Sequence, residues 1–199
     1  RYYPHGELFA HVIGYVGRIN DKELKNIDQN LYAGTNLIGK LGIEKSYEDL
    51  LHGTPGFESI EADAYGNVLR NLGRQVPVRG NDLYLSIDYG LQTVAAQQLT
   101  GNRGAIVAMD PRTGEILALV SSPSFNPNLF VTGISSKNYN ALRDDLDQPM
   151  YNRAVQGVYP PGSTIKPMFG LGGIHYGLIT WRTLFSAPVF FTFPVYTPR

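Results

Sequence analysis

The segment from residue 83 to residue 120 restricts the fold most, because it combines a strand, a capped helix and a hairpin. Residues 83–87 (LYLSI) alternate between apolar and polar side chains, which predicts a strand. Asp88 stands at the N-cap of a helix predicted over residues 89–99. One apolar stripe runs along this helix, formed by Leu91, Val94, Ala95, Gln98 and Leu99.

Two further strands are predicted directly after this helix. Residues 104–109 (GAIVAM) form an apolar run typical of a buried strand, and residues 115–120 (EILALV) form its return strand. Pro111 presets φ for a turn between them, so residues 110–114 are interpreted as a hairpin turn rather than a functional loop. A helix followed by an antiparallel hairpin predicts an α+β fold.

The chain divides into two predicted segments, 1–80 and 81–199, because Pro77 and Gly80 interrupt the pattern between them. The first segment contains a predicted strand at 11–16, a helix at 42–52 that ends at Gly53, and a half-buried strand at 57–61 followed by a turn. In the second segment, a loop at 121–128 and a helix at 138–146 follow the hairpin.

Charge and composition argue against several functions. Seventeen basic residues balance 17 acidic ones without a basic stripe, so no nucleic-acid surface is expected. The four histidines have no partners at metal-ligand spacing, and no metal or cofactor is predicted. We interpret Asp144, Asp145 and Asp147 as a solvated helix end. The lack of cysteine slightly favours an extracytoplasmic location.

No signal peptide or transmembrane helix is predicted within these residues. The chain opens with Arg-Tyr-Tyr-Pro-His, and no apolar stretch follows. The longest charge-free stretches, 167–181 and 183–198, are shorter than the roughly 20 apolar residues that a bilayer requires. A membrane anchor would therefore lie upstream of Arg1.

Residues 159–167 (YPPGSTIKP) carry the strongest chemical signal. Ser163 opens a helix predicted over residues 165–176, and Lys166 would lie on the same face, with Cβ atoms about 5–6 Å apart. A lysine amine that burial or a nearby positive charge keeps neutral can accept the serine proton and activate the hydroxyl. The backbone N–H of Ser163, at a helix N-terminus, would contribute to an oxyanion hole.

Spacing alone leaves a simpler interpretation open. A serine that caps a helix, with a solvated lysine one turn later, gives the same pattern. Pro167 also fits a plain helix start poorly, because it lacks the N–H that would bond the Ser163 carbonyl. Tyr159 and Thr164 are candidates to line a substrate cleft, although packing explains Tyr159 equally well.

Longer stretches resemble the class B penicillin-binding proteins. Residues 159–167, preceded by Asn152-Arg153-Ala154, resemble their first active-site motif. Residues 107–120 (VAMDPRTGEILALV) resemble the hairpin that opens their transpeptidase domain. Three pairs of stretches are similar to the elongation-specific penicillin-binding protein 2 group: RYYP with HVIGYV, IGKLGIE with YEDLLHG, and PNLFV with GISSK.

This resemblance implies a pedestal followed by a transpeptidase domain of the serine β-lactamase-like class. Residues 1–80 would be the membrane-distal part of the dimerisation-type pedestal, and residues 81–199 the first part of the transpeptidase domain. Ser163, with Lys166 as proton acceptor, would attack the D-Ala-D-Ala carbonyl of a peptidoglycan stem peptide and pass the acyl group to a neighbouring strand. β-Lactams would acylate the same serine.

The resemblance also implies partners and a location. Such proteins act in cell elongation and rod shape with a RodA-like glycosyltransferase and an elongation-complex scaffold. They are anchored upstream of the pedestal, at the periplasmic face of the inner membrane of Gram-negative bacteria.

After Lys166 the sequence departs from this family. The motifs Ser-x-Asn or Ser-x-Asp and Lys-Thr-Gly or Lys-Ser-Gly do not follow, and residues from Ser186 on no longer match closely. We therefore expect this chain alone to be inactive. Two alternatives stay open: a serine β-lactamase, for which we find no deacylating carboxylate, and a non-enzymatic pedestal fragment that binds and activates a glycosyltransferase.

Overall fold

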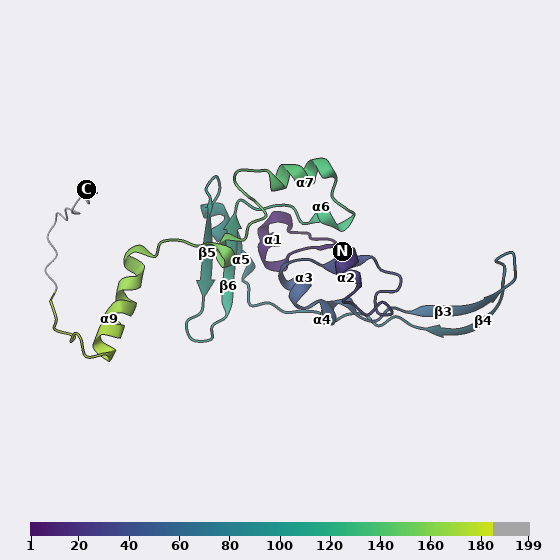
Figure 1. Cartoon of the computed structure of the whole chain (residues 1–199), viewed down its shortest axis with the longest axis horizontal. Coiled ribbons are helices and arrows are strands. Elements are labelled where there is room, and N and C mark those ends of the chain that lie inside the picture. The colour runs from purple at the N-terminus through teal and green to yellow at the C-terminus, as the bar shows by residue number, and fades with distance from the viewer. Residues whose placement is uncertain (185–199) are drawn as a thin grey trace, which may run out of the picture. The chain divides into compact units, whose positions relative to one another are not determined.

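The structure, a computed structural model, describes residues 1–184 and contains two compact units, Arg1–Gly157 and the residues from Val158 on (Figure 1). The elements of the first unit are η1 (Gly6–Phe9), α1 (Ala10–Ile13), β1 (Val16–Arg18), α2 (Asp21–Leu24), β2 (Leu37–Gly39), α3 (Gly42–Ser46), α4 (Glu48–His52), β3 (Phe57–Ala62), β4 (Val68–Gln75), α5 (Tyr89–Gln98), β5 (Gly104–Met109), β6 (Ile116–Ser122), α6 (Asn128–Val131), α7 (Ser136–Arg143) and α8 (Arg153–Gln156). The second unit contains η2 (Gly162–Ile165) and α9 (Lys166–His175).

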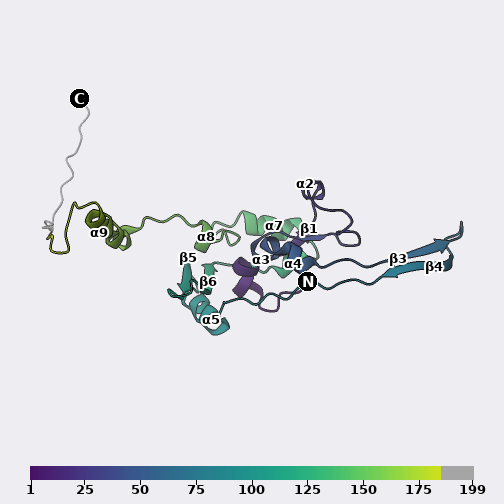
Figure 2. The same ribbon diagram turned by 90° about the horizontal axis from the view of Figure 1, so that it is seen from below.

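The strands of the first unit form three antiparallel pairs, β1–β2, β3–β4 and β5–β6. Helix α5 lies along the β5–β6 hairpin in both views (Figures 1 and 2). Helices and antiparallel hairpins therefore alternate along the chain, which confirms the predicted α+β fold. No helix within residues 1–184 combines the length and apolar character needed to cross a membrane.

A small aromatic core joins the two predicted segments of the chain. Ala10 from the first segment packs with Phe125 and Phe130 from the second. Tyr3 and Asn128 reinforce this contact through two hydrogen bonds of 2.9 Å. The Tyr3 N–H donates to the Asn128 side-chain oxygen, and the Asn128 side-chain nitrogen donates to the Tyr3 carbonyl. Because residues 1–157 share one compact unit, the predicted boundary near residue 80 does not coincide with a division in the contacts. The boundary stays a prediction.

The strongest local predictions are confirmed. Asp88 caps α5, since its carboxylate accepts a 2.7 Å hydrogen bond from the Leu91 N–H. The β5–β6 turn closes where it was expected, with Gly114 at φ 80°. The predicted helix at 42–52 is present as α3 and α4, separated at Tyr47, and it ends at Gly53 with φ 74°.

The strand predicted at residues 11–16 is wrong. The chain forms the short helix α1 over Ala10–Ile13, and β1 begins only at Val16. The physical reason is Gly14, whose φ of 76° ends the helix and turns the chain. A Cβ on Gly14 would lie 1.9 Å from the Leu41 carbonyl oxygen, so only glycine fits this contact.

The strand predicted at residues 83–87 is also wrong. These residues form no strand, although the Asp88 N–H donates to the Leu117 carbonyl at 2.8 Å. Further along the same edge of β6, the Gln92 side chain forms hydrogen bonds with both the N–H and the carbonyl of Leu119. A helix side chain thus occupies the hydrogen-bonding position that a neighbouring strand would need.

Several predicted elements have the right type but a different exposure or length. The β3–β4 ribbon is exposed rather than half-buried, and in the predicted buried strand β5, Val107 and Met109 are 47% and 55% exposed. Of the apolar stripe on α5, Ala95 is the residue that is buried. Helix α7 is shifted relative to the predicted 138–146, and β6 extends through Ser122 into the predicted loop.

Candidate active site

Residues 159–176 fold as a tight turn that leads into a helix (Figure 1). Pro161 precedes the 3-10 helix η2, and Gly162 opens it with φ 54°, a conformation that favours glycine. Ser163 is therefore the second residue of η2, and Lys166 is the first residue of α9. The Pro-Pro-Gly sequence is the signal for this turn.

The backbone of Ser163 and Lys166 explains how Pro167 is accommodated. In a regular α-helix the Pro167 nitrogen would donate to the Ser163 carbonyl, but proline has no N–H. The Lys166 N–H donates to that carbonyl instead, across the shorter 3-10 turn. Lys166 keeps α-helical dihedral angles, φ −57° and ψ −40°, despite the following proline. The motif thus starts a helix without leaving the Ser163 carbonyl unpaired.

The side chains of Ser163 and Lys166 project from one side of this turn, because residues three apart eclipse each other in a 3-10 helix. Both are exposed, and no hydrogen bond joins them within residues 1–184. Of the two ways in which the lysine amine could be kept neutral, burial is therefore absent from the described part of the chain. Thr164 bonds back to the Pro161 carbonyl, and Tyr159 is 59% exposed.

The remaining candidates have structural explanations. Within the described range, no three His, Asp or Glu side chains are grouped to hold a metal ion. His11 packs edge-on against Phe125 at 5.4 Å, and burial lowers its pKa. In the predicted solvated cluster, Asp144 pairs with Arg143 at 2.7 Å and Asp147 with Arg103 at 2.7 Å.

Two protein families match the chain in succession. Residues 1–85 match the Penicillin-binding Protein dimerisation domain, and residues 104–190 match the Penicillin binding protein transpeptidase domain, which includes the Ser163 turn. The peptidoglycan D,D-transpeptidase MrdA of Acinetobacter baumannii is 77% identical over 194 residues, which are 98% of this chain and 29% of that protein.

The chain belongs to the class B penicillin-binding proteins. Among solved structures, Pseudomonas aeruginosa PBP2 in complex with WCK 5153 is similar to this chain, with a TM-score of 0.83 and 49% sequence identity. The match covers 98% of this chain and 40% of the P. aeruginosa chain. The complex of Helicobacter pylori PBP2 with MreC gives a TM-score of 0.84 and 38% identity, covering 98% of this chain and 36% of that one.

These comparisons confirm the predicted family, including its penicillin-binding protein 2 branch. The penicillin-binding protein chain spans less than a third of the length of the Acinetobacter relative.

Proposed function

We propose that the complete protein containing this chain is a peptidoglycan D,D-transpeptidase of cell elongation. Ser163 is its nucleophile, and Lys166 accepts the serine proton. The observation that carries this proposal is the placement of both residues on one turn at the start of α9, inside the segment that matches the transpeptidase family. The relative that is 77% identical bears the name peptidoglycan D,D-transpeptidase.

The reaction balances as an acyl transfer in two steps. The Ser163 Oγ attacks the carbonyl between the two D-Ala residues, and its proton passes to the Lys166 amine. The bond to the last D-Ala breaks, and that amine leaves with the proton. An amine of a neighbouring stem peptide then attacks the acyl-serine, forms the cross-link and returns the proton to Ser163.

The turn also suits the charge that develops during this reaction. Within residues 1–184, no acceptor is hydrogen-bonded to the Ser163 N–H. This donor is therefore open to the oxyanion of the tetrahedral intermediate, as an oxyanion hole requires. The Thr164 side chain is held by Pro161, so its proposed contact with substrate requires that bond to open. Tyr159, which is exposed beside the turn, is proposed as a wall of the cleft.

A fluorescent penicillin tests this function in the complete protein. A transpeptidase should keep a stable fluorescent adduct, and Ser163→Ala should abolish it. Lys166→Met should slow its formation by roughly a hundredfold or more, since it removes the proton acceptor. Rapid release of the hydrolysed penicillin would instead identify a serine β-lactamase and refute the transpeptidase proposal.

The pedestal role is a second proposal, and the H. pylori PBP2 complex with MreC supports it. We propose that residues 1–80 form the dimerisation-type pedestal, which binds an elongation-complex scaffold and a RodA-like glycosyltransferase, and that residues 81–199 begin the transpeptidase domain. The protein would be anchored upstream of Arg1 and face the periplasm of a Gram-negative bacterium. If residues 1–157, which form one compact unit, fail to co-purify with either partner while the complete protein succeeds, this assignment is wrong.

A further inference from the structure

A cavity of about 500 Å³ lies in the first unit, between β1 and the segment that joins α6 to α7. Its volume falls within the roughly 300–1,000 Å³ that is usual for small-ligand sites. The stretches HVIGYV, IGKLGIE, PNLFV and GISSK each contribute a residue to it, but the proposed transpeptidase reaction does not use it. The residues that matter for its chemistry are Tyr15, Arg18, Lys40, Phe130, Gly133 and Tyr139.

The floor of the cavity is aromatic and rigid. Tyr15 stacks on Phe130, with ring centroids 4.0 Å apart and an angle of 23° between the planes, and Phe130 is only 5% exposed. Burial, with a smaller contribution from Tyr139, raises the pKa of Tyr15, so its hydroxyl remains neutral and able to donate a hydrogen bond. The floor thus combines an apolar surface with the Tyr15 hydroxyl.

The rim of the cavity carries a guanidinium group. A Cβ atom on Gly133 would lie 3.7 Å from Arg18 Nε and 3.8 Å from its Cζ, so the guanidinium lies against the bare backbone of this glycine. Gly133 has a φ of 96°, which favours glycine here for a second reason. Throughout residues 1–184, no hydrogen bond or ion pair joins the Arg18 guanidinium to another residue, although its backbone pairs with Leu37 in the β1–β2 sheet.

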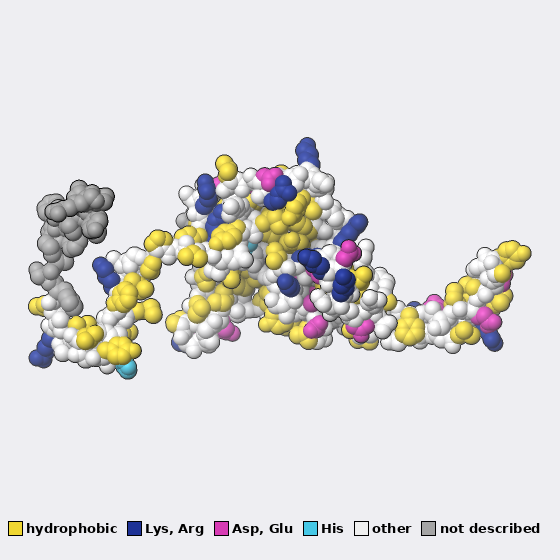
Figure 3. All heavy atoms as spheres, viewed as in Figure 1, with side chains coloured by type: hydrophobic (Ala, Val, Ile, Leu, Met, Phe, Trp, Pro, Cys, Tyr) yellow, Lys and Arg dark blue, Asp and Glu magenta, His cyan; other side chains and the backbone are white. Residues whose placement is uncertain are grey.

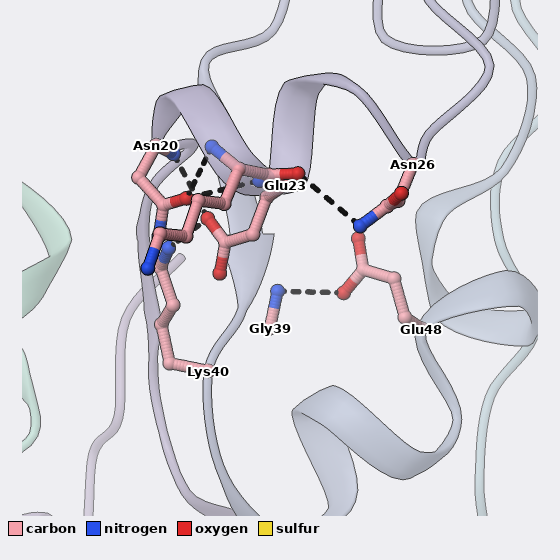
Figure 4. Close-up of polar contacts among 7 residues, drawn as sticks. Asn20, Glu23, Asn26, Gly39, Lys40 and Glu48 are labelled. Atoms are coloured by element: carbon pink, nitrogen blue, oxygen red, sulfur yellow. Dashed lines mark hydrogen bonds and ion pairs between the residues drawn. The ribbon is translucent and has the colours of Figure 1, made fainter.

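The second cation at this cavity is already neutralised. Lys40 pairs with Glu23, whose carboxylate also completes the capping box of Asn20 at the start of α2 (Figure 4). Burial, the largest single effect, raises the Glu23 pKa, but the hydrogen bonds from Lys40 and the Asn20 N–H and the charges of Lys40 and Lys45 together lower it below its ordinary value. No acidic residue lines the cavity in the described part of the chain. Arg18 therefore provides an uncompensated positive charge.

Figure 3 shows hydrophobic side chains gathered near α6, with charged side chains of both signs at the margin of this patch. An apolar floor beneath an unpaired guanidinium is complementary to a ligand with a carboxylate on an apolar body. Arginine binds carboxylates through two parallel hydrogen bonds, which fixes both their position and their orientation.

We propose that this cavity binds a short peptide in which a carboxylate lies next to an aromatic side chain. Arg18 holds the carboxylate, and the aromatic group packs on Tyr15 and Phe130. Offset stacking or edge-to-face packing of aromatic rings adds to the burial of their surface, so an aromatic ligand should bind better than a purely ionic one.

Titration of the 199-residue chain with N-acetyl-L-phenylalanine, followed by NMR, tests this proposal. The neutral amide of the same compound tests the need for charge, and acetate tests the need for the aromatic group. The acid should bind on the order of tenfold more tightly than either, because only the acid makes both contacts. Arg18→Gln should remove this advantage, and Arg18→Lys should retain part of it.

Arg112→Gln provides the matched control, because Arg112 is an exposed arginine that pairs with Asp110 in the β5–β6 turn. It should leave the binding of the acid unchanged. Equal binding of acid and amide, equal binding of acid and acetate, or an unchanged affinity in Arg18→Gln would each overturn the proposal. Ser163→Ala should not alter the binding of this probe, so the result is independent of the proposed transpeptidase function.

Discussion

The Gln92 side chain hydrogen-bonds both backbone groups of Leu119. Its amide nitrogen donates to the Leu119 carbonyl at 2.9 Å, and its oxygen accepts from the Leu119 N–H at 2.8 Å. The same nitrogen donates to the Leu8 carbonyl at 2.9 Å. One fully buried glutamine thus connects α5, the edge of β6 and the N-terminal region.

Replacing this glutamine should therefore destabilise the first unit. Gln92→Leu leaves backbone groups of Leu119 and Leu8 without partners, which should lower the free energy of unfolding by about 2–4 kcal/mol. Urea denaturation of the chain measures the change. Gln97→Leu, at an exposed position on the same helix, should change it by no more than about 0.5 kcal/mol. Equal effects of the two substitutions would contradict this role.

The hydroxyl of Tyr3 should also be important for stability. It donates to the buried Glu44 carboxylate at 3.1 Å and accepts from the Val16 N–H at 2.9 Å. Tyr3→Phe should cost about 1–3 kcal/mol in the free energy of unfolding, because both partners lose a bond. Tyr2→Phe is the natural control, since Tyr2 is 77% exposed. A loss in Tyr2→Phe as large as that in Tyr3→Phe would argue against this interpretation.

His11 should make the fold sensitive to mild acid. Burial lowers its pKa below the ordinary value of 6.5, so the folded state holds the neutral ring. The unfolded state binds the proton more readily than the folded state. The stability that the neutral His11 ring contributes is therefore fully present above pH 6.5, and it is lost as the pH falls from there through the folded-state pKa.

Urea midpoints measured between about pH 8 and about pH 5 test this behaviour. His11→Gln should reduce the loss of stability on acidification, whereas His5→Gln, at an exposed histidine, should leave it unchanged. If His11→Gln loses as much stability on acidification as the unaltered chain does, His11 is not the source of that loss.

Gly162 should matter for acylation through its backbone. Alanine at φ 54° would strain the turn by about 1–2 kcal/mol or move Ser163. In the complete protein, Gly162→Ala should reduce the rate of acylation by penicillin about tenfold to a hundredfold. Gly101→Ala introduces similar strain, at φ 75°, in the turn between α5 and β5. If both variants acylate at the same rate, the Gly162 conformation is unimportant for the reaction.

The sequence predicted those elements whose signals are local. The Asp88 cap and the Gly114 turn lie where they were expected, because each depends on a few neighbouring residues. The strands predicted at 11–16 and 83–87 failed because distant contacts decide them. At the first, Gly14 meets Leu41, and at the second, Gln92 takes the place of a neighbouring strand.

The candidate sites divide in the same way. Ser163 and Lys166 became candidates because a short motif carries them inside a longer stretch that resembles the family, and the turn explains how Pro167 follows them. Arg18 has no motif around it. Its position over Gly133 arises from residues more than a hundred positions apart, and spacing along the chain gives no signal of it.

The site at which a β-lactam attaches to the complete protein decides whether Ser163 is the nucleophile. Mass spectrometry of peptides from the complete protein, after reaction with a penicillin, locates the modified side chain. We expect a single acyl adduct on Ser163, absent from Ser163→Ala. An adduct on any other residue, or one that persists in Ser163→Ala, would contradict it.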